Sequence, residues 1–195
     1  MNDILNGTLV RLSAVDPEEF SKAFAVWRRD SEFMRLMDSN ATRLASQKDA
    51  QKSLEKELED QQLNQHWFTI RTLAEDKLIG DIGLYVVNWS GRYAFVGLGI
   101  GERDFWGKGY GTDAMHLILG YAFMEVNLRR VTLTVFEYNP RAIRSYEKAG
   151  FRHEGRLRKL LHRDGNRYDE LFMGILRDEW MESNVHVRRA AGDGG

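Results

Sequence analysis

The sequence contains no cysteine and only two prolines. Without cysteine there are no disulfides, thiolate metal sites or iron–sulfur clusters, and no mechanism can pass through a cysteine nucleophile. This composition fits a cytoplasmic protein, and we expect a cytoplasmic location. The two prolines, Pro17 and Pro140, both stand where we expect the first turn of a helix, a position that tolerates the missing N–H group.

Long apolar runs and an excess of charge are missing as well. No run approaches the ~20 residues of a membrane-spanning helix, and we expect no secretory signal at the amino terminus. With 28 Lys and Arg against 29 Asp and Glu, the net charge is −1. We therefore expect no nucleic-acid and no membrane partner. The five histidines show no paired spacing typical of ligands, so we expect no metal site.

The chain is long and apolar enough for one folded domain. Its 195 residues are 43% hydrophobic, which suffices for a sizeable core. We expect a single domain over residues 1–183. The final residues, at 184–195, end in small, polar and glycine-rich positions and are expected to form a flexible tail.

The first third of the chain predicts one strand followed by helices. Residues 8–13 alternate as a strand does, and Asp16 can cap a helix that Pro17 begins, with Glu19 completing a capping box. One face of this helix is apolar at Phe20, Ala23, Phe24 and Trp27. A second helix is expected to start at Ser46 and to run through the charged LEKELEDQQL stretch, as a solvated outer helix.

The rest of the chain alternates strands and helices. Strands are expected at 67–72, 78–87, 93–100, 130–135, 156–162 and 167–176, and helices at 112–125 and from Asn139-Pro140 to Gly150. The Asp164-Gly165 pair predicts a tight hairpin turn. This order indicates an α/β or α+β fold with a single sheet.

Six of the 18 glycines lie between positions 97 and 111. Gly97, Gly99 and Gly101 alternate, so in a strand they share one face, which carries no side chains. Such a bare face indicates a place where another backbone or a ligand approaches closely.

The second group of glycines lies in the loop before the helix at Thr112. Backbone N–H groups around Gly107, Gly109 and Gly111 can converge on an anion, the helix N-terminus adds partial positive charge, and Lys108 adds a full one. The arrangement suits a ligand with an extended arm and a phosphate group. The same spacing also fits a flexible glycine loop at a strand–helix corner.

Two familiar phosphate-binding motifs do not match. In a P-loop the lysine is followed by Ser or Thr, whereas Gly109 follows Lys108. The dinucleotide fingerprint G-x-G-x-x-G does not fit either, because the second gap between Gly107, Gly109 and Gly111 is one residue short.

Two longer motifs resemble one family. Phe105-Trp106-Gly107-Lys108-Gly109-Tyr110-Gly111-Thr112 resembles the pyrophosphate loop of the GNAT superfamily of N-acetyltransferases, and the block from Asn139 to Phe151 (NPRAIRSYEKAGF) resembles its second conserved block. The end of the chain, from Glu154 to Trp180, is similar to the branch of ribosomal-protein-alanine and spermidine acetyltransferases. The resemblance is clear from about Leu78 to Trp180.

This resemblance implies a fold and a set of site residues. The fold is a mixed, mostly antiparallel central sheet with helices on both faces. Acetyl-CoA is the implied cosubstrate, with its arm along the strand and its pyrophosphate on the loop. Tyr146 is the implied acid that protonates the departing thiolate. The implied cofactor-binding residues are Gly99, Ile100, Gly101, Trp106, Gly107, Lys108, Gly109, Tyr110, Gly111, Thr112 and Asn139. Asn139 also suits a helix cap, and the two roles are compatible.

The general base stays open at this point. Relatives often carry an acid in this same strand, ahead of its glycine. Here the residues from Tyr93 to Val96 include no acid, which weakens a polyamine assignment. Four other acids are candidates, each also explicable as a surface or turn residue: Asp81, Glu102, Asp104 and Glu137.

The sequence thus predicts direct transfer of an acetyl group from acetyl-CoA to a primary amine, on a protein N-terminus or a small molecule. A polyamine or antibiotic acceptor is an alternative, as is a catalytically silent CoA-binding or acyl-sensing module. A nucleotide-binding protein that uses the glycine loop is a third. A homodimer is possible, since dimers are common in this branch.

Overall fold

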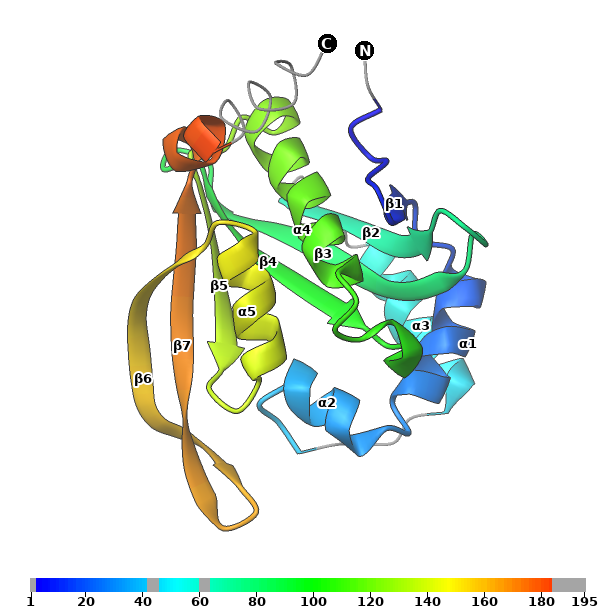
Figure 1. Ribbon diagram of the computed structural model, residues 1–195. Helices are drawn as coiled ribbons and strands as arrows, with labels where there is room; N and C mark the ends of the chain where they lie inside the picture. Colours follow the sequence, from blue (N-terminus) through cyan, green and yellow to red (C-terminus); the bar gives the residue numbers. More distant parts are fainter. Residues whose placement is uncertain (1–2, 42–45, 60–63, 184–195) are drawn as a thin grey trace. The chain divides into compact units, whose positions relative to one another are not determined.

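The computed structural model describes residues 3–41, 46–59 and 64–183 (Figure 1). The chain forms two compact units. Unit 1 consists of Met1–Tyr85 and Gly97–Ile118, and unit 2 of Val86–Val96 and Leu119–Gly195. The flexible tail expected at 184–195 lies outside the described residues.

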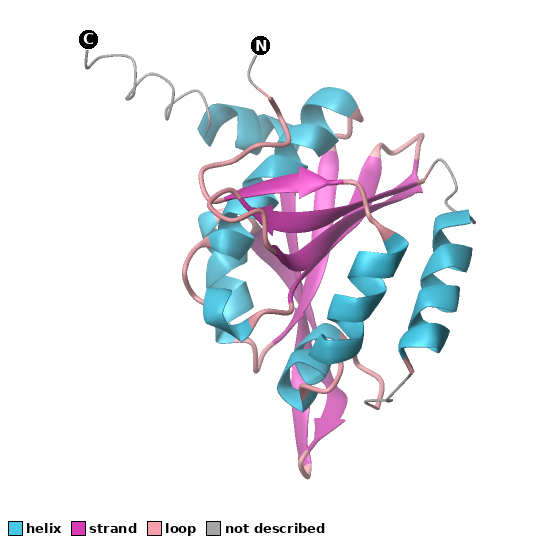
Figure 2. Cartoon of the chain, turned by 90° about the vertical axis from the view of Figure 1, so that its right-hand side faces the viewer, coloured by secondary structure: helices cyan, strands magenta, loops and turns pink. Residues whose placement is uncertain are grey.

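Unit 1 contains most of the helices. Its elements are β1 (Val10–Ser13), α1 (Pro17–Trp27), α2 (Ser31–Met37), α3 (Gln47–Glu59), β2 (Gln65–Thr72), the first part of β3 (Leu78–Asn88), the end of β4 (Tyr93–Ile100), the short 3-10 helix η1 (Arg103–Phe105) and most of α4 (Tyr110–Gly120). Helices lie on both faces of its strands, α1 and α3 on one and α4 on the other (Figure 1, Figure 2). The sequence pattern does not predict α2.

Unit 2 is built on a long hairpin. Its elements are the end of β3, the start of β4, the end of α4 with the π-helical turn η2 (Tyr121–Glu125), β5 (Arg130–Phe136), α5 (Pro140–Lys148), β6 (Arg152–Arg163) and β7 (Asn166–Leu176). The single helix predicted over 112–125 therefore changes to π geometry after Gly120. Asp164 and Gly165 both adopt positive φ in the predicted turn between β6 and β7.

The strands are hydrogen-bonded in the order β1-β2-β3-β4-β5-β7-β6. Antiparallel pairs join β1 to β2, β2 to β3, β5 to β7 and β6 to β7. The parallel ladder between β4 and β5 runs only from Tyr93↔Arg130 to Phe95↔Thr132. A mixed, mostly antiparallel sheet is the predicted fold, and it is confirmed.

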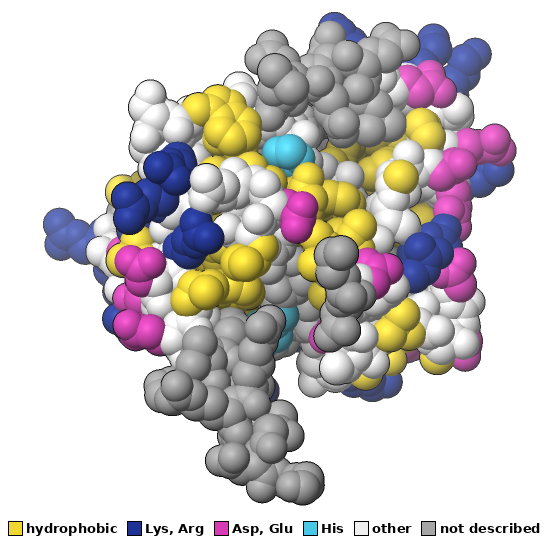
Figure 3. Space-filling view, turned by 90° about the horizontal axis from the view of Figure 1, so that it is seen from above, with side chains coloured by type: hydrophobic (Ala, Val, Ile, Leu, Met, Phe, Trp, Pro, Cys, Tyr) yellow, Lys and Arg dark blue, Asp and Glu magenta, His cyan; other side chains and the backbone are white. Residues whose placement is uncertain are grey.

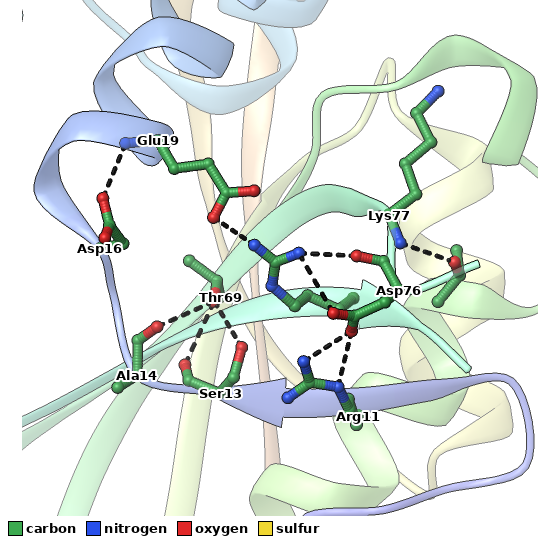
Figure 4. A network of polar contacts seen from close by, with 10 residues as sticks. Arg11, Ser13, Ala14, Asp16, Glu19, Thr69, Asp76 and Lys77 are labelled. Atoms are coloured by element: carbon green, nitrogen blue, oxygen red, sulfur yellow. Dashed lines mark hydrogen bonds and ion pairs between the residues drawn. The ribbon is translucent and has the colours of Figure 1, made fainter. Parts of the chain in front are cut away.

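A polar network ties the start of α1 to the neighbouring strands (Figure 4). Asp16 caps α1 as predicted, since its Oδ1 accepts a hydrogen bond of 2.8 Å from the Glu19 N–H group. The Glu19 carboxylate, however, pairs with Arg71 on β2, so the predicted capping box is only half formed. Arg71 also donates to the carbonyl oxygen of Asp76 at 2.6 Å. The network thereby fixes the register of α1 against β2.

An aromatic cluster forms the core of unit 1 beneath α1. Phe20 and Trp27 are both 3% exposed, and Phe20 makes edge contacts with Trp27 and with Trp67 of β2, at ring-centroid distances of 6.0 and 5.4 Å. The predicted apolar face of α1 is therefore the core face. Leu54 of α3 is buried in the same cluster, so α3 is not wholly a solvated outer helix.

The surface carries both signs of charge. On the face seen in Figure 3, Lys and Arg side chains are interspersed with Asp and Glu, in keeping with the net charge of −1. Among the described residues, no helix is both long and apolar enough to span a membrane.

Candidate functional site

The three alternate glycines of the β4 region have different surroundings. A Cβ atom at Gly97 would meet nothing within 4 Å, whereas one at Gly99 would lie 2.8 Å from Cε of Met37, and one at Gly101 would overlap the indole ring of Trp27. At Gly99 and Gly101, the room expected for a ligand on this face is therefore taken by side chains of α1 and α2. Another backbone also approaches closely, because a Cβ at Gly80 of β3 would overlap the Gly99 carbonyl oxygen.

The contact between Gly101 and Trp27 gives a stability prediction. In Gly101→Ala the added methyl group overlaps a buried indole ring, so we expect the free energy of unfolding to fall by about 1–3 kcal/mol in urea denaturation. Gly97→Ala is the matched control, expected to stay within about 0.5 kcal/mol of the wild type. Equal losses in the two variants would contradict this packing.

The loop after β4 leads into the start of α4 through two glycines in left-handed backbone conformations. Gly107 and Gly109 adopt φ values of +73° and +94°, which only glycine reaches without strain. The first helical hydrogen bond runs from the Asp113 N–H group to the Gly109 carbonyl oxygen at 2.9 Å. The N–H groups of this first helical turn point towards the N-terminal end of α4, and exposed Lys108 adds a positive charge beside them.

Trp106 connects this loop to the end of β4 through a side-chain hydrogen bond. Its Nε1–H group donates a hydrogen bond of 2.6 Å to the Ile100 carbonyl oxygen. The guanidinium of Arg103 lies 4.9 Å from the centre of the Trp106 ring and is held by Asp30, which caps α2, through a 2.7 Å bond from Nη2 to Oδ1. Residues from α2, β4 and the loop thus position one another.

Asp113 anchors the start of the chain to the first turn of α4. Its Oδ2 accepts hydrogen bonds from the backbone N–H groups of Thr8, Leu9 and Val10 at 3.0, 2.8 and 3.0 Å. This places Leu9 Cδ1 3.4 Å from where a Cβ of Gly109 would lie. Local sequence patterns do not indicate this contact, because it joins positions more than one hundred residues apart.

The remaining predicted site residues lie in unit 2, on α5. Asn139 is 9% exposed and caps the helix, with Oδ1 accepting from the Ala142 N–H group at 3.1 Å. Tyr146 is 7% exposed, with its ring 6.1 Å from that of Phe151. Burial raises the pKa of Tyr146 to about 12, so its phenol keeps its proton at every physiological pH.

Comparison with known proteins identifies the family. A family model described as an acetyltransferase (GNAT) domain matches residues 10–152. The chain belongs to the GNAT acetyltransferase family. This GNAT chain is 34% identical over 116 residues to a probable N-acetyltransferase, YjcK, of Bacillus subtilis, and 32% identical over 108 residues to a putative ribosomal N-acetyltransferase, YdaF, of the same organism. The matches cover 59% and 55% of this chain, and 64% and 58% of those relatives, less than two thirds of their length.

Solved structures agree on the fold. A spermidine N-acetyltransferase from Vibrio cholerae, in complex with CoA and spermine, superposes with a TM-score of 0.77 at 23% identity, covering 88% of this GNAT chain and 98% of that one. A GNAT-family acetyltransferase from Bacillus anthracis gives a TM-score of 0.73 at 21% identity, covering 89% and 98% of the two chains. The predicted GNAT fold is therefore confirmed.

The four acids proposed as bases are in unlike surroundings in this GNAT chain. Both carboxylate oxygens of Glu102 accept hydrogen bonds, Oε1 from Trp27 Nε1 at 2.9 Å and Oε2 from Lys77 Nζ at 2.7 Å. Burial raises the pKa of Glu102, but these two hydrogen bonds outweigh it and bring the pKa below its ordinary value. Glu102 is thus a structural carboxylate that joins α1 to the end of β4.

The other three acids also differ in their surroundings. Asp104 is exposed in η1. Glu137, in unit 2, accepts a 2.8 Å hydrogen bond from the Asp169 N–H group and so supports the end of β5. Asp81, on β3, lies beside Gly99. Among the residues that the structure describes, no cluster of three or more His, Cys, Asp or Glu could hold a metal ion.

Proposed function

We propose that this GNAT chain transfers an acetyl group from acetyl-CoA directly to a primary amine. The observation that carries the proposal is the continuous run from Gly99 to Thr112 in unit 1. It joins a strand end, two glycines of positive φ and the amides at the start of an eleven-residue helix. These groups fit an extended arm followed by a pyrophosphate.

Each predicted site residue has a role in this proposal. The backbone of Gly99 to Gly101 pairs with the pantetheine arm, the amides from Trp106 to Thr112 bind the pyrophosphate, and Lys108 adds charge attraction. Asn139 holds the arm while it caps α5, and Tyr146 donates a hydrogen bond to the departing sulfur. Because the chain has no cysteine, no acyl-cysteine can form, and the amine attacks the thioester itself.

The proposal extends to the setting of the enzyme. Residues 1–183 act as one domain, the protein works in the cytoplasm, and it pairs as a homodimer. No metal takes part. The acceptor is a protein N-terminus or a small-molecule amine. Spermidine and a ribosomal-protein peptide are the first to try, since proteins of similar fold or sequence are named for such acceptors.

A calorimetric titration with acetyl-CoA and a mass-spectrometric product screen test this function. We expect binding of acetyl-CoA, and a product heavier by one acetyl group from at least one amine of a panel that includes spermidine and N-terminal peptides. Binding without any acetylated product would favour the silent acyl-sensing module instead. Failure to bind acetyl-CoA would contradict both the acetyltransferase and the acyl-sensing module.

A further inference from the structure

Asp81 is a half-buried carboxylate on β3, and its Oδ1 atom lies beside Gly99 of β4. Its Oδ2 accepts a 3.0 Å hydrogen bond from the Nε1–H group of Trp67 on β2. Trp67 itself packs edge-on against Phe20 of the aromatic cluster. The partly buried indole, packed against this cluster, therefore orients the carboxylate.

Gly99 leaves room for this carboxylate beside β4. A Cβ atom at Gly99 would lie 3.4 Å from Oδ1 of Asp81 and 2.8 Å from Cε of Met37. A larger residue at position 99 would displace Met37 and press on Asp81. The absence of a side chain thus lets a negative charge approach the strand whose backbone, under the proposed function, holds the thioester.

A carboxylate beside β4 can bind and deprotonate an acceptor amine that is mostly protonated near neutral pH. An aliphatic amine has a pKa of ~10.4, so near neutral pH about one molecule in two thousand is uncharged and nucleophilic. A carboxylate between apolar and aromatic walls attracts the ammonium form by charge and hydrogen bonding. Trp67, which donates to Asp81, and Met37, which lies beside Gly99, are apolar neighbours of the kind that suits an alkyl chain.

We propose that Asp81 binds the acceptor as a protonated primary amine and takes its proton, an inference that rests on the proposed acetyl transfer. One ammonium proton passes to an Asp81 oxygen and then to solvent. The nitrogen lone pair forms the new bond to the acetyl carbonyl carbon, and the carbon–sulfur bond breaks with its electron pair going to sulfur. The second proton lost by nitrogen balances the one that sulfur gains.

Steady-state kinetics of Asp81→Asn test the catalytic half of the proposal. With butylamine as acceptor, we expect kcat/KM to fall about 10- to 30-fold while the Kd of acetyl-CoA stays unchanged. With trifluoroethylamine, which is already neutral near pH 7, the loss should shrink to threefold or less. Asp178→Asn, which alters an exposed carboxylate in unit 2, is the control and should match the wild type. Equal losses with both amines, or a kcat/KM within twofold of the wild type, would overturn the proposal.

The binding half has a readout that needs no turnover. In protein labelled with 15N-tryptophan, the Trp67 indole signal, assigned with Trp67→Phe among the five tryptophans, reports on the bond to Asp81. Butylammonium should shift that signal in the wild type but not in Asp81→Asn, and butanol should shift it in neither. An equal shift in both proteins would overturn the proposal.

The two measurements also separate this inference from the proposed function. If the wild type acetylates no amine yet butylammonium shifts the Trp67 signal only when Asp81 is present, acetyl transfer fails and the ammonium site stands. If acetylation proceeds and Asp81→Asn changes neither readout, the function stands and Asp81 has no part in it. Trp67→Phe removes one N–H donor without the charge, and should lower kcat/KM by threefold to fivefold.

Discussion

Replacing Tyr146 by Phe should lower kcat at least 100-fold while the Kd of acetyl-CoA changes by less than twofold. The substitution removes one hydroxyl group from a buried ring that packs against Phe151, so α5 keeps its packing. Loss of a general acid costs about 10²- to 10⁴-fold in rate. Steady-state kinetics with calorimetry on the same preparation measures both quantities.

The pKa of Tyr146 decides what form this catalysis takes. Against a thiol pKa of ~8.5, complete proton transfer from a phenol of pKa about 12 is uphill by roughly 3.5 units, or about 5 kcal/mol. A hydrogen bond to the forming thiolate, with the proton following as the charge develops, avoids most of this cost. The phenol acts in its protonated form, so its contribution is present below pH 10 and is lost only as the pH rises towards about 12.

The pH profile checks this assignment. The wild-type rate should rise with pH as more of the amine becomes neutral. Below pH 10 it should show no descending limb, because Tyr146 is still protonated there. Tyr121→Phe is the matched control, since burial also raises the pKa of that phenol and it lies in the same unit. A descending limb near pH 9 that disappears in Tyr146→Phe, or a kcat of Tyr146→Phe equal to that of Tyr121→Phe, would refute the role of Tyr146 as the acid.

Local signals in the sequence predicted local structure well. Asp16 caps α1, Asn139 caps α5 and Gly150 ends it with a φ of +99°, because caps and stops depend on a few neighbouring residues. The alternating residues of β4 and the turn at Asp164-Gly165 were also predicted from neighbouring residues alone. The glycine loop was found for that reason too, since its chemistry lies within one short segment.

Contacts between distant segments could not be predicted in this way. Glu19 fits a capping box, yet its carboxylate pairs with Arg71, which lies 52 residues away. The bare glycine face was expected to meet another backbone or a ligand, and nothing local indicates that Trp27 and Met37 pack against Gly101 and Gly99. Among four acids of equal standing in the sequence, only the fold places Asp81 beside Gly99 and engages Glu102 with Lys77. Tertiary packing decides which role each side chain has, where the local sequence allows more than one role.

The second large effect is expected at Gly109. In Gly109→Val a β-branched residue must adopt a φ of +94°, which strains the backbone by about 1–3 kcal/mol, and its methyl groups crowd Leu9, whose Cδ1 is already 3.4 Å from the Cβ position. The loop should relax away from this conformation and withdraw one or two amides from the pyrophosphate, each worth about 1.5–3 kcal/mol. We expect the Kd of acetyl-CoA to rise 100-fold or more in calorimetric titrations.

Gly165→Val separates strain from binding. Gly165 also has a positive φ, +76°, and a Cβ there meets nothing within 4 Å, so the backbone penalty is similar but falls in the β6–β7 turn of unit 2. Both variants should lose comparable stability in urea, while only Gly109→Val weakens acetyl-CoA binding. If Gly109→Val bound acetyl-CoA as Gly165→Val does, the amides of this loop would not be the anion site, and the strand end from Gly99 to Gly101 would have to hold the cosubstrate without them.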